Sequence, residues 1–392
     1  MADPADTSAA PRSIGVLARS RKENEHRLPI HPRHLADIDD ALRPYLHLEQ
    51  GYGLHFGVTD DDLRPLVGRI ASREELIADC DIILLPKVQA EDLAQMREGQ
   101  TVWGWPHCVQ DAALTQVAID RRLTLIAFEA MNLWTADGRF ALHVFHKNNE
   151  LAGYCSVLHA LQLAGRTGDY GRRLKATVIG FGATARGAVT ALNAHGISDV
   201  RVLTNRDVAA VGSPIHGTHI VQLERGDDGD PANLWCLTPE GLVPVAEFLA
   251  DNDVIVNCVL QDPDAPLTFM DETDLAMIPP GSIVVDVSCD EGMGFSWARP
   301  TTFDEPSFVV GDNVLYYAVD HSPSLLWDSA TWEISAALLP HLGSVMAGPS
   351  GWDEAPVVSR AIEIREGVVT NPAILSFQER DEAYPHPMPA AR

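Results

Sequence analysis

The sequence predicts an α/β fold of two domains. Each domain is expected to be built on a parallel sheet, and long helices are expected to join the two. Short apolar runs alternate with helix-length stretches along most of the 392 residues, which is the pattern of strands linked by helices. Hydrophobic residues make up 46% of the chain, enough at this length for two to three domains. Six cysteines are widely spaced without C-x-x-C pairs, so we expect reduced and mostly buried thiols.

The first part of the chain contains five strand-like apolar runs separated by helix-length segments. They lie at residues 14–18, 46–49, 82–85, 102–105 and 123–128. Residues 148–164 then space their apolar side chains at helical intervals and end at Gly165, so we expect a long helix that leads into a second domain.

The second part repeats the alternation and ends in another long helix. Strands are expected at residues 175–179, 200–204, 254–258, 283–287 and 308–310, and a helix over 325–342. This helix suggests that the chain returns to the first domain, giving a discontinuous domain of residues 1–147 and 324–392 around a middle domain of 148–323. Residues 206–240 are read as a polar surface excursion, and the Pro-rich tail 363–392 as frayed.

The charge balance disfavours two classes of partner. There are 29 Lys and Arg against 55 Asp and Glu, a formal charge of −26, which repels nucleic acid and anionic membrane surfaces. No apolar run reaches the roughly 18 residues of a membrane span, and the first 12 residues do not resemble a signal peptide, so we expect a cytoplasmic protein. We expect no metal site. Small anions should bind only where local cations or helix N-termini outweigh the acidic surroundings.

The strongest local motif is a glycine-rich turn between a strand and a helix. Gly180-Phe181-Gly182-Ala183-Thr184-Ala185 follows the strand KATVI and opens a helix, which is G-x-G-x-x-A in the context that dinucleotide binding requires. Gly180 permits the tight turn, Gly182 lets the backbone approach a pyrophosphate, and Ala185 allows close helix packing. The competing interpretation, an ordinary glycine turn, does not explain the strand before it and the helix after it.

The end of the next strand indicates which dinucleotide is bound. The run ends in Thr204-Asn205-Arg206 without an acidic residue at its tip, and these side chains suit a 2′-phosphate better than a free ribose hydroxyl. We therefore expect NADP(H), with NAD(H) as the alternative because Asp207 follows directly. Val259 and Val287 are also assigned to the cofactor site.

Three polar residues in the first domain are candidates for chemistry. Lys87 ends a strand, where α/β sheets bind ligands, His107 follows the next strand, and Arg27 has the planar fork that binds a carboxylate. Taken one at a time, each has an ordinary alternative: a solvated lysine, a hydrogen-bonded structural histidine and a surface arginine.

Five segments together resemble a known superfamily. The order SRKENEHRLPIHP, ILLPK, GWPHC, AFEAMN and GFGATARG is similar to that of the alanine dehydrogenase and saccharopine dehydrogenase superfamily, over residues 14–342. Within it, MREGQTVWGWPH, KNNELAGYCSVLHALQ and AVDHSPSLLW resemble the N5-(carboxyethyl)ornithine synthases, and VDHSPSLL also resembles fungal saccharopine dehydrogenase.

The resemblance implies two Rossmann-like domains with the active site in the cleft between them. It implies that Arg27 binds a keto-acid carboxylate, that Lys87 and His107 hold and protonate the carbonyl or imine, and that Glu129 supports the pocket. Asp290 and His321 would lie by the nicotinamide, Asp290 as a catalytic group. His321 replaces the asparagine that alanine dehydrogenases and the N5-(carboxyethyl)ornithine synthases carry there, and it matches the saccharopine-type pattern.

The function expected from these features is an NADPH-dependent reductive condensation. A pyruvate-like 2-keto acid would join the side-chain amine of ornithine, lysine or a related diamino acid. The alternatives are an alanine dehydrogenase that uses ammonia, a saccharopine-type enzyme with Arg19, Arg21 or Lys22 at a distal carboxylate, and a non-catalytic NADP-binding redox sensor. A homo-oligomer is implied by the relatives, with Trp327 and Trp332 at an interface or in the core.

Overall fold

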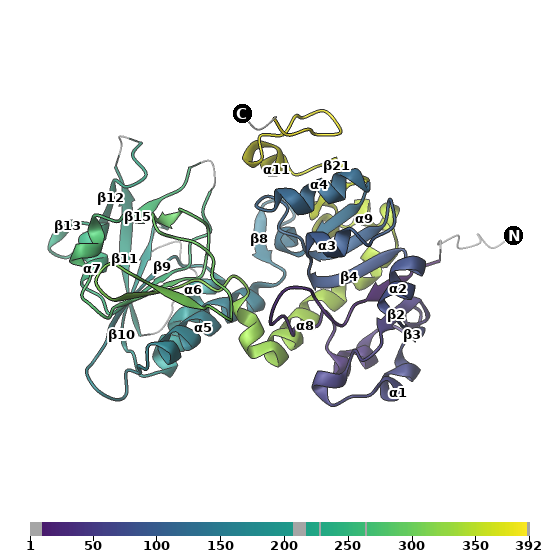
Figure 1. The fold of residues 1–392 in the computed structure, drawn as a ribbon, viewed down its shortest axis with the longest axis horizontal. Helices are drawn as coiled ribbons and strands as arrows, with labels where there is room; N and C mark the ends of the chain where they lie inside the picture. Colours follow the sequence, from purple (N-terminus) through teal and green to yellow (C-terminus); the bar gives the residue numbers. More distant parts are fainter. Residues whose placement is uncertain (1–9, 207–216, 227–228, 263–264, 390–392) are drawn as a thin grey trace, which may run out of the picture. The chain divides into compact units, whose positions relative to one another are not determined.

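The chain forms two compact units, each with its own sheet (Figure 1). The computed structural model describes residues 10–206, 217–226, 229–262 and 265–389. Unit 1 comprises Met1–Phe145 and Trp327–Arg392, and unit 2 comprises His146–Leu326. The boundaries expected from the sequence, 147/148 and 323/324, differ from these by two and three residues. The α/β class with parallel-rich sheets is confirmed.

Unit 1 contains an eight-stranded sheet in the order β21-β20-β6-β5-β4-β1-β2-β3. The first six strands in the sequence pair in parallel, in the doubly wound order 3-2-1-4-5-6, and β20 and β21 add an antiparallel edge. The strands are β1 (Ile14–Val16), β2 (Leu46–Glu49), β3 (Arg69–Ala71), β4 (Ile82–Lys87), β5 (Thr101–Trp105), β6 (Thr124–Ala127), β20 (Ile362–Arg365) and β21 (Val368–Val369).

The central strands of unit 1 are apolar along their whole length because both faces of the sheet are covered. All six residues of β4 are buried, and its alternate side chains join two different hydrophobic clusters, Ile82 and Leu84 on one face and Ile83 and Leu85 on the other. The helices of unit 1 include α2 (Arg73–Asp79), α4 (Ala112–Asp120), α8 (Trp327–Met346), α9 (Pro349–Glu354) and α11 (Pro372–Phe377). α8 contributes to the first cluster through Ile334, Leu338 and Leu342.

Unit 2 repeats the doubly wound order in its parallel strands. Its nine-stranded sheet runs β13-β12-β11-β10-β9-β14-β16-β19-β18, with antiparallel strands at both edges. The strands are β9 (Lys175–Ile179), β10 (Asp199–Thr204), β11 (Thr218–Arg225), β12 (Leu234–Thr238), β13 (Gly241–Pro244), β14 (Val254–Asn257), β16 (Ile283–Asp286), β18 (Ser307–Val310) and β19 (Val314–Tyr317). The helices α5 (His146–Leu163), α6 (Ala183–Ala194) and α7 (Val245–Ala250) complete the unit, and α5 packs along α6.

The doubly wound order fixes where each unit can bind a ligand. The strand order reverses between β1 and β4 in unit 1 and between β9 and β14 in unit 2. Ligands of such sheets bind outside the carboxyl ends of the strands at these reversals. In unit 1 these ends carry the loop after β1, with Arg27, and the end of β4 at Lys87. In unit 2 they carry the Gly180 turn and the loop after β14.

Two expectations about irregular segments were wrong. Most of the described part of 206–240 belongs to the sheet of unit 2 and is not a surface excursion. β11 pairs in parallel with β10, and the antiparallel strands β12 and β13 then extend the sheet. Residues 207–216 and 227–228 lie outside the described part. The tail is not frayed over 363–389. It supplies β20, β21 and α11 (yellow in Figure 1), and the buried Arg380 donates to Gln116 on α4 at 2.8 Å.

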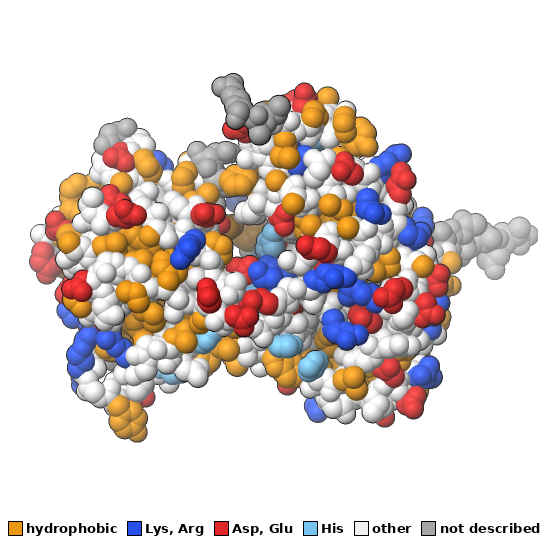
Figure 2. Space-filling model, in the orientation of Figure 1, with side chains coloured by type: hydrophobic (Ala, Val, Ile, Leu, Met, Phe, Trp, Pro, Cys, Tyr) orange, Lys and Arg blue, Asp and Glu red, His pale blue; other side chains and the backbone are white. Residues whose placement is uncertain are grey.

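The cysteines and the helices agree with the sequence interpretation. All six thiols are free, and Cys258 and Cys289 are the two that are partly exposed. Among the described helices, none is long and apolar enough to cross a membrane. Acidic and basic side chains are interspersed on the face shown in Figure 2.

Candidate active site

The glycine-rich turn of unit 2 adopts the backbone conformation that the motif predicts. Gly180 ends β9 with a φ of +107°, which a side chain would strain, and an added Cβ would lie 3.3 Å from the backbone of Cys258. Gly182 is the N-cap of α6, and an added Cβ there would meet nothing within 4 Å. The backbone N–H groups of the first turn of α6 are thus available for a pyrophosphate.

Close packing of α5 on α6 depends on two glycines that the sequence analysis did not single out. A Cβ on Gly187 would lie 1.7 Å from the carbonyl oxygen of Glu150, and one on Gly153 would lie 1.9 Å from that of Thr184. Ala185 is fully buried beside them. The small residues therefore fix the helix that presents the pyrophosphate-binding turn.

A pocket of about 330 Å³ follows this turn, and its lining fits the adenosine half of a dinucleotide. Polar groups at the end of β10 line one part of the pocket, and apolar side chains line another part. The lining residues are Gly180, Phe181, Gly182, Thr184, Leu203, Thr204, Asn205, Arg206, Leu223, Cys258, Val259, Leu260 and Leu267.

The structure brings most of the predicted cofactor residues around this pocket. Asn205 and Arg206 are exposed at its rim, and the N–H of Arg206 donates to Thr204 Oγ1 at 3.1 Å. Ala183 and Ala185 belong to α6 behind the turn, and Val287, directly after β16, does not line the pocket. Asp207, the acidic neighbour, lies outside the described residues.

Two carboxylates lie at the carboxyl end of β16, Asp286 as its last residue and Asp290 in the segment that follows. Asp286 is fully buried, accepts from Tyr316 Oη at 2.7 Å and Asn257 Nδ2 at 3.0 Å, and burial raises its pKa to about 6. Burial also raises the pKa of Asp290, whose Oδ2 is buried without a hydrogen-bond partner in the described structure. Asp286 therefore anchors the strand end, and Asp290 has an acceptor atom left for a ligand.

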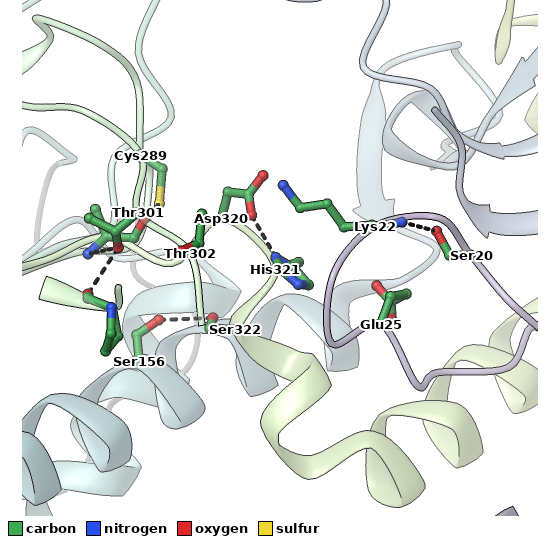
Figure 3. A network of polar contacts seen from close by, with 12 residues as sticks. Ser20, Lys22, Glu25, Ser156, Cys289, Thr301, Thr302, Asp320, His321 and Ser322 are labelled. Atoms are coloured by element: carbon green, nitrogen blue, oxygen red, sulfur yellow. Dashed lines mark hydrogen bonds and ion pairs between the residues drawn. The ribbon is translucent and has the colours of Figure 1, made fainter. Parts of the chain in front are cut away.

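His321 is buried and held by its sequence neighbour. The residue is 2% exposed, and its Nδ1 lies 2.6 Å from Asp320 Oδ1 (Figure 3). Its ring packs edge-on against Phe303. Ser322 follows and accepts from Ser156 Oγ of α5 at 2.9 Å. Asp320 was not predicted from the sequence, although its position beside a histidine in the DHS motif was a signal for it.

In unit 1, Arg27 is a buried arginine with a carboxylate partner. Its Nε and Nη2 donate to Glu25 Oε1 at 2.8 Å and Oε2 at 2.5 Å, and its guanidinium carbon lies 5.3 Å from the ring centre of Trp105. Glu25 thus occupies one edge of the guanidinium. A bidentate substrate carboxylate would have to use the other edge, formed by Nη1 and Nη2.

Lys87 and Trp105 are register partners at the ends of β4 and β5. Lys87 is 8% exposed, which overturns the alternative of a solvated lysine, and its carbonyl accepts from Ser20 Oγ at 2.6 Å. Because Arg27 stacks on Trp105 and His107 comes two residues after it, Trp105 connects all three candidate residues of unit 1.

His107 and Glu129 lie at the ends of neighbouring strands. His107 has a φ of +50°, and its backbone N–H donates to Glu129 Oε1 at 2.7 Å while its Nδ1 lies 3.9 Å from the same oxygen. Burial, together with the nearby carboxyl of Glu363, raises the pKa of Glu129 to about 8. Both effects favour the protonated form of Glu129 beside His107 and Lys87.

Two carboxylates of this site were missed from the sequence. Glu25 stands two residues before Arg27, an interval that a loop can close into an ion pair, and this was an available signal. Glu363 comes from β20 in the C-terminal segment, and nothing in the local sequence connects it with Glu129.

Two of the cations suggested for a distal carboxylate are already paired within unit 1. Arg19 Nη2 lies 3.6 Å from Glu49 Oε1, and Arg21 Nε lies 3.1 Å from the buried Asp92 Oδ1. Lys22 donates its backbone N–H to Ser20 Oγ at 3.1 Å (Figure 3). Trp327 is half-buried against Phe56, and Trp332 is 44% exposed, so neither ring belongs to the buried core of unit 1.

Comparisons with known proteins agree over most of the chain. Residues 15–151 match the model of the alanine dehydrogenase/PNT N-terminal domain, and residues 171–372 match that of the C-terminal domain. An alanine dehydrogenase of Mycobacterium tuberculosis is 25% identical over 373 residues, covering 91% of this chain and 94% of the relative. An N(5)-(carboxyethyl)ornithine synthase of Clostridium botulinum is 24% identical over 336 residues, covering 82% and 91%.

Solved structures share the fold. An L-alanine dehydrogenase superposes with a TM-score of 0.71 at 18% identity, covering 93% of this chain and 98% of its own. A transhydrogenase from Sinorhizobium meliloti gives a TM-score of 0.66 at 19% identity, with coverages of 92% and 99%.

Proposed function

The chain belongs to the alanine dehydrogenase/PNT family, whose members are NAD(P)-dependent oxidoreductases, and on this basis we propose that it catalyses an NADPH-dependent reductive condensation. A pyruvate-like 2-keto acid and the side-chain amine of a diamino acid such as ornithine or lysine form an imine with loss of water. The imine is then reduced to a secondary amine.

The observation that carries the proposal is the grouping of Arg27, Lys87 and His107 around Trp105. Condensation requires a cation for the keto-acid carboxylate and groups that move protons at the reacting carbon and its oxygen. Arg27 provides the cation through its Nη1–Nη2 edge. Lys87 and His107, at the ends of adjacent strands, protonate the leaving oxygen and take the proton from the attacking amine.

The cofactor would be held by unit 2. The N-terminal turn of α6 binds the pyrophosphate, Asn205 and Arg206 bind the 2′-phosphate, and Val259 contacts the adenosine half. When bound, the reduced nicotinamide supplies the hydride that the imine carbon receives. Asp290 and His321 would orient the nicotinamide and its ribose, Asp290 through its unpartnered oxygen and His321 in the orientation that Asp320 holds.

The pairing of the cations in unit 1 argues for a diamino acid over 2-oxoglutarate as co-substrate. A saccharopine-type reaction needs a further cation for a second carboxylate, yet Arg19 and Arg21 are engaged by Glu49 and Asp92. The net charge of −26 is also suited to attract a cationic amino acid.

A second candidate is the reductive amination of pyruvate to alanine, the reaction that uses ammonia as the amine. The relatives keep it as a candidate, because alanine dehydrogenases match this chain at nearly the same identity as N(5)-(carboxyethyl)ornithine synthases do.

One assay separates the candidates. Purified protein is incubated with NADPH or NADH, pyruvate and in turn ammonia, ornithine or lysine, and the loss of absorbance at 340 nm and the product mass are recorded. Product with ornithine or lysine supports the proposal, and product with ammonia alone supports alanine dehydrogenase. Nucleotide binding without turnover for any pair would indicate a redox sensor.

We also propose that the protein assembles from several copies of itself. The exposed ring of Trp332 lies against His31 and His34 on the surface of unit 1, where a second copy could cover it. The molar mass from light scattering would test this, and Trp332→Ser should lower it.

A further inference from the structure

A second carboxylate faces Glu129 from the C-terminal segment of unit 1. Glu363 is 4% exposed on β20, the strand that pairs with β6 immediately before Glu129. The hydrogen bond from the N–H of Ala127 to the carbonyl oxygen of Ala361, 2.7 Å long, joins the two segments there. Glu363 therefore approaches the site from an element that carries none of the predicted catalytic residues.

A β-bulge aims this side chain. On β20, Ile362 pairs with Ile126 of β6 and Ile364 pairs with Leu125. The two partners on β6 are adjacent residues, whereas Glu363 lies between the two isoleucines on β20. Ile362 joins the hydrophobic cluster on one face of the sheet and Ile364 the cluster on the other. Bulges of this kind turn the extra residue out of the ladder, and they occur beside active sites.

Each of the two carboxyl groups accepts a hydrogen bond from nitrogen at one oxygen, and the Cys108 thiol also lies against Glu363. Glu129 Oε1 accepts the N–H of His107 at 2.7 Å, and Glu363 Oε1 accepts Nδ2 of Asn371 at 3.0 Å. The Oε2 atoms of both are buried without a hydrogen-bond partner in the described structure. Two carboxylates whose Oε2 atoms are buried repel each other when ionised, and a single proton between them removes the repulsion.

Other titratable groups surround the pair unequally. Lys87 and His107 face Glu129, and its backbone carbonyl contacts Nε2 of His143 at 3.2 Å. Glu363 is faced by the buried thiol of Cys108, whose pKa burial raises well above its usual range. The cationic groups thus stand on the Glu129 side, and no charged partner of Glu363 is recorded among the described residues apart from Glu129.

We propose that Glu363 is a positioning residue that shares one proton with Glu129 and thereby sets the charge that Glu129 presents to Lys87 and His107. With the proton held by the pair, Lys87 and His107 face a neutral carboxyl at Glu129. Without Glu363, Glu129 would release its proton at a lower pH, and its negative charge would then favour the cationic forms of Lys87 and His107. The role of Glu363 in catalysis rests on the proposed function, whereas the proton that it shares with Glu129 does not.

The first experiment measures the proton directly in the unliganded protein. Infrared spectra of the wild type, recorded against pH, should show the C=O stretch of a protonated carboxyl that persists above pH 7 and is missing in Glu129→Gln. In Glu363→Gln, which keeps the oxygen that accepts from Asn371, this band should disappear about 1–2 pH units lower. Glu366→Gln is the matched control, because Glu366 is exposed on the same β20–β21 hairpin. An unchanged band in Glu363→Gln would overturn the proposal.

The second experiment measures the consequence for the reaction. The pH profile of kcat/KM for the amine should move to higher pH in Glu363→Gln, because the charged Glu129 raises the pKa of the groups that must lose a proton, and it should not move in Glu366→Gln. A loss of kcat with an unmoved profile would show a structural role only and would contradict the proposal. If the wild type turns over no substrate pair, the proposed function fails while the infrared result still decides the shared proton.

Discussion

The backbone N–H of His107 donates to Glu129 Oε1 at 2.7 Å, and His107 itself lies in the left-handed region with a φ of +50°. A non-glycine residue in this conformation costs on the order of 1 kcal/mol, and surrounding contacts must hold it. The carboxyl group of Glu129 supplies such a contact, so it fixes the direction of the imidazole through the main chain.

Replacing Glu129 by alanine should slow the reaction more than replacing it by glutamine. In Glu129→Ala the N–H of His107 loses its acceptor, a loss of about 1–3 kcal/mol, and we expect kcat to fall by roughly 10- to 100-fold. Glu129→Gln keeps an oxygen acceptor and should retain more activity than Glu129→Ala at its own optimal pH. Steady-state kinetics on both variants check this, and equal losses would mean that the hydrogen bond does not position His107.

Lys87→Ala and His107→Ala should separate chemistry from cofactor binding. Each removes a proton-transferring group, which is worth about 10²- to 10⁴-fold in rate, so turnover should be lost. The pocket that fits the dinucleotide is lined by unit 2 residues alone, and NADPH titrated by fluorescence should bind both variants as it binds the wild type. Wild-type kcat in either variant would remove that residue from the mechanism.

Arg206→Ala tests the choice between NADPH and NADH. The side chain stands at the rim of the pocket beside Asn205, and a charge-assisted hydrogen bond to a 2′-phosphate is worth about 1.5–3 kcal/mol. We expect KM for NADPH to rise by roughly 10- to 100-fold and KM for NADH to stay unchanged. Arg225→Ala, an exposed arginine on β11 outside the pocket, is the matched control. An equal effect on both nucleotides would contradict a 2′-phosphate contact.

The sequence was most informative where local chemistry determines structure. Strands β14 and β16 were predicted to within one residue of their observed bounds because buried parallel strands are continuous apolar runs. The Gly180 turn was recognisable because its glycines meet a backbone requirement within a few residues. The short strand β3 was missed because its three residues include the polar Arg69 and form too short an apolar run to detect.

Long-range pairing was the part that could not be predicted. Nothing in ERGDDGD or in the Pro-rich tail indicates that β11 and β20 extend sheets, because strand partners far apart in the chain determine this. The same limit applies to the site. Glu363 reaches Glu129 only through the pairing of β20 with β6, and the bulge that aims it follows from the packing of Ile362 and Ile364.

The pairing of Arg27 with Glu25 predicts a specific defect in keto-acid binding. Removing one partner of a buried ion pair leaves an uncompensated charge, which costs about 3–5 kcal/mol of stability. Glu25→Gln keeps the volume and one acceptor, so the protein should fold while the guanidinium is held less firmly. We expect KM for the keto acid to rise by roughly tenfold with KM for NADPH unchanged, and Arg27→Lys to be worse because it loses both the fork and the stacking on Trp105. Unchanged keto-acid kinetics in both variants would exclude Arg27 from the substrate site.

The carboxyl pair also predicts how stability depends on pH. The folded-state pKa of Glu129, about 8, lies above the usual value of roughly 4.3, so the folded protein binds this proton more tightly than the unfolded chain does. The stabilisation is therefore complete below about pH 4.3 and is lost as the pH rises through about 8. Glu363→Gln removes the like charge and should raise the melting temperature of unit 1 at pH 8 by roughly 5 °C, with little change at pH 5. Glu366→Gln should leave both values as in the wild type, since its carboxyl is exposed. Calorimetry at the two pH values checks this. If the melting temperature falls from pH 5 to pH 8 by the same amount in Glu363→Gln as in the wild type, the two carboxyls do not repel each other in the folded protein.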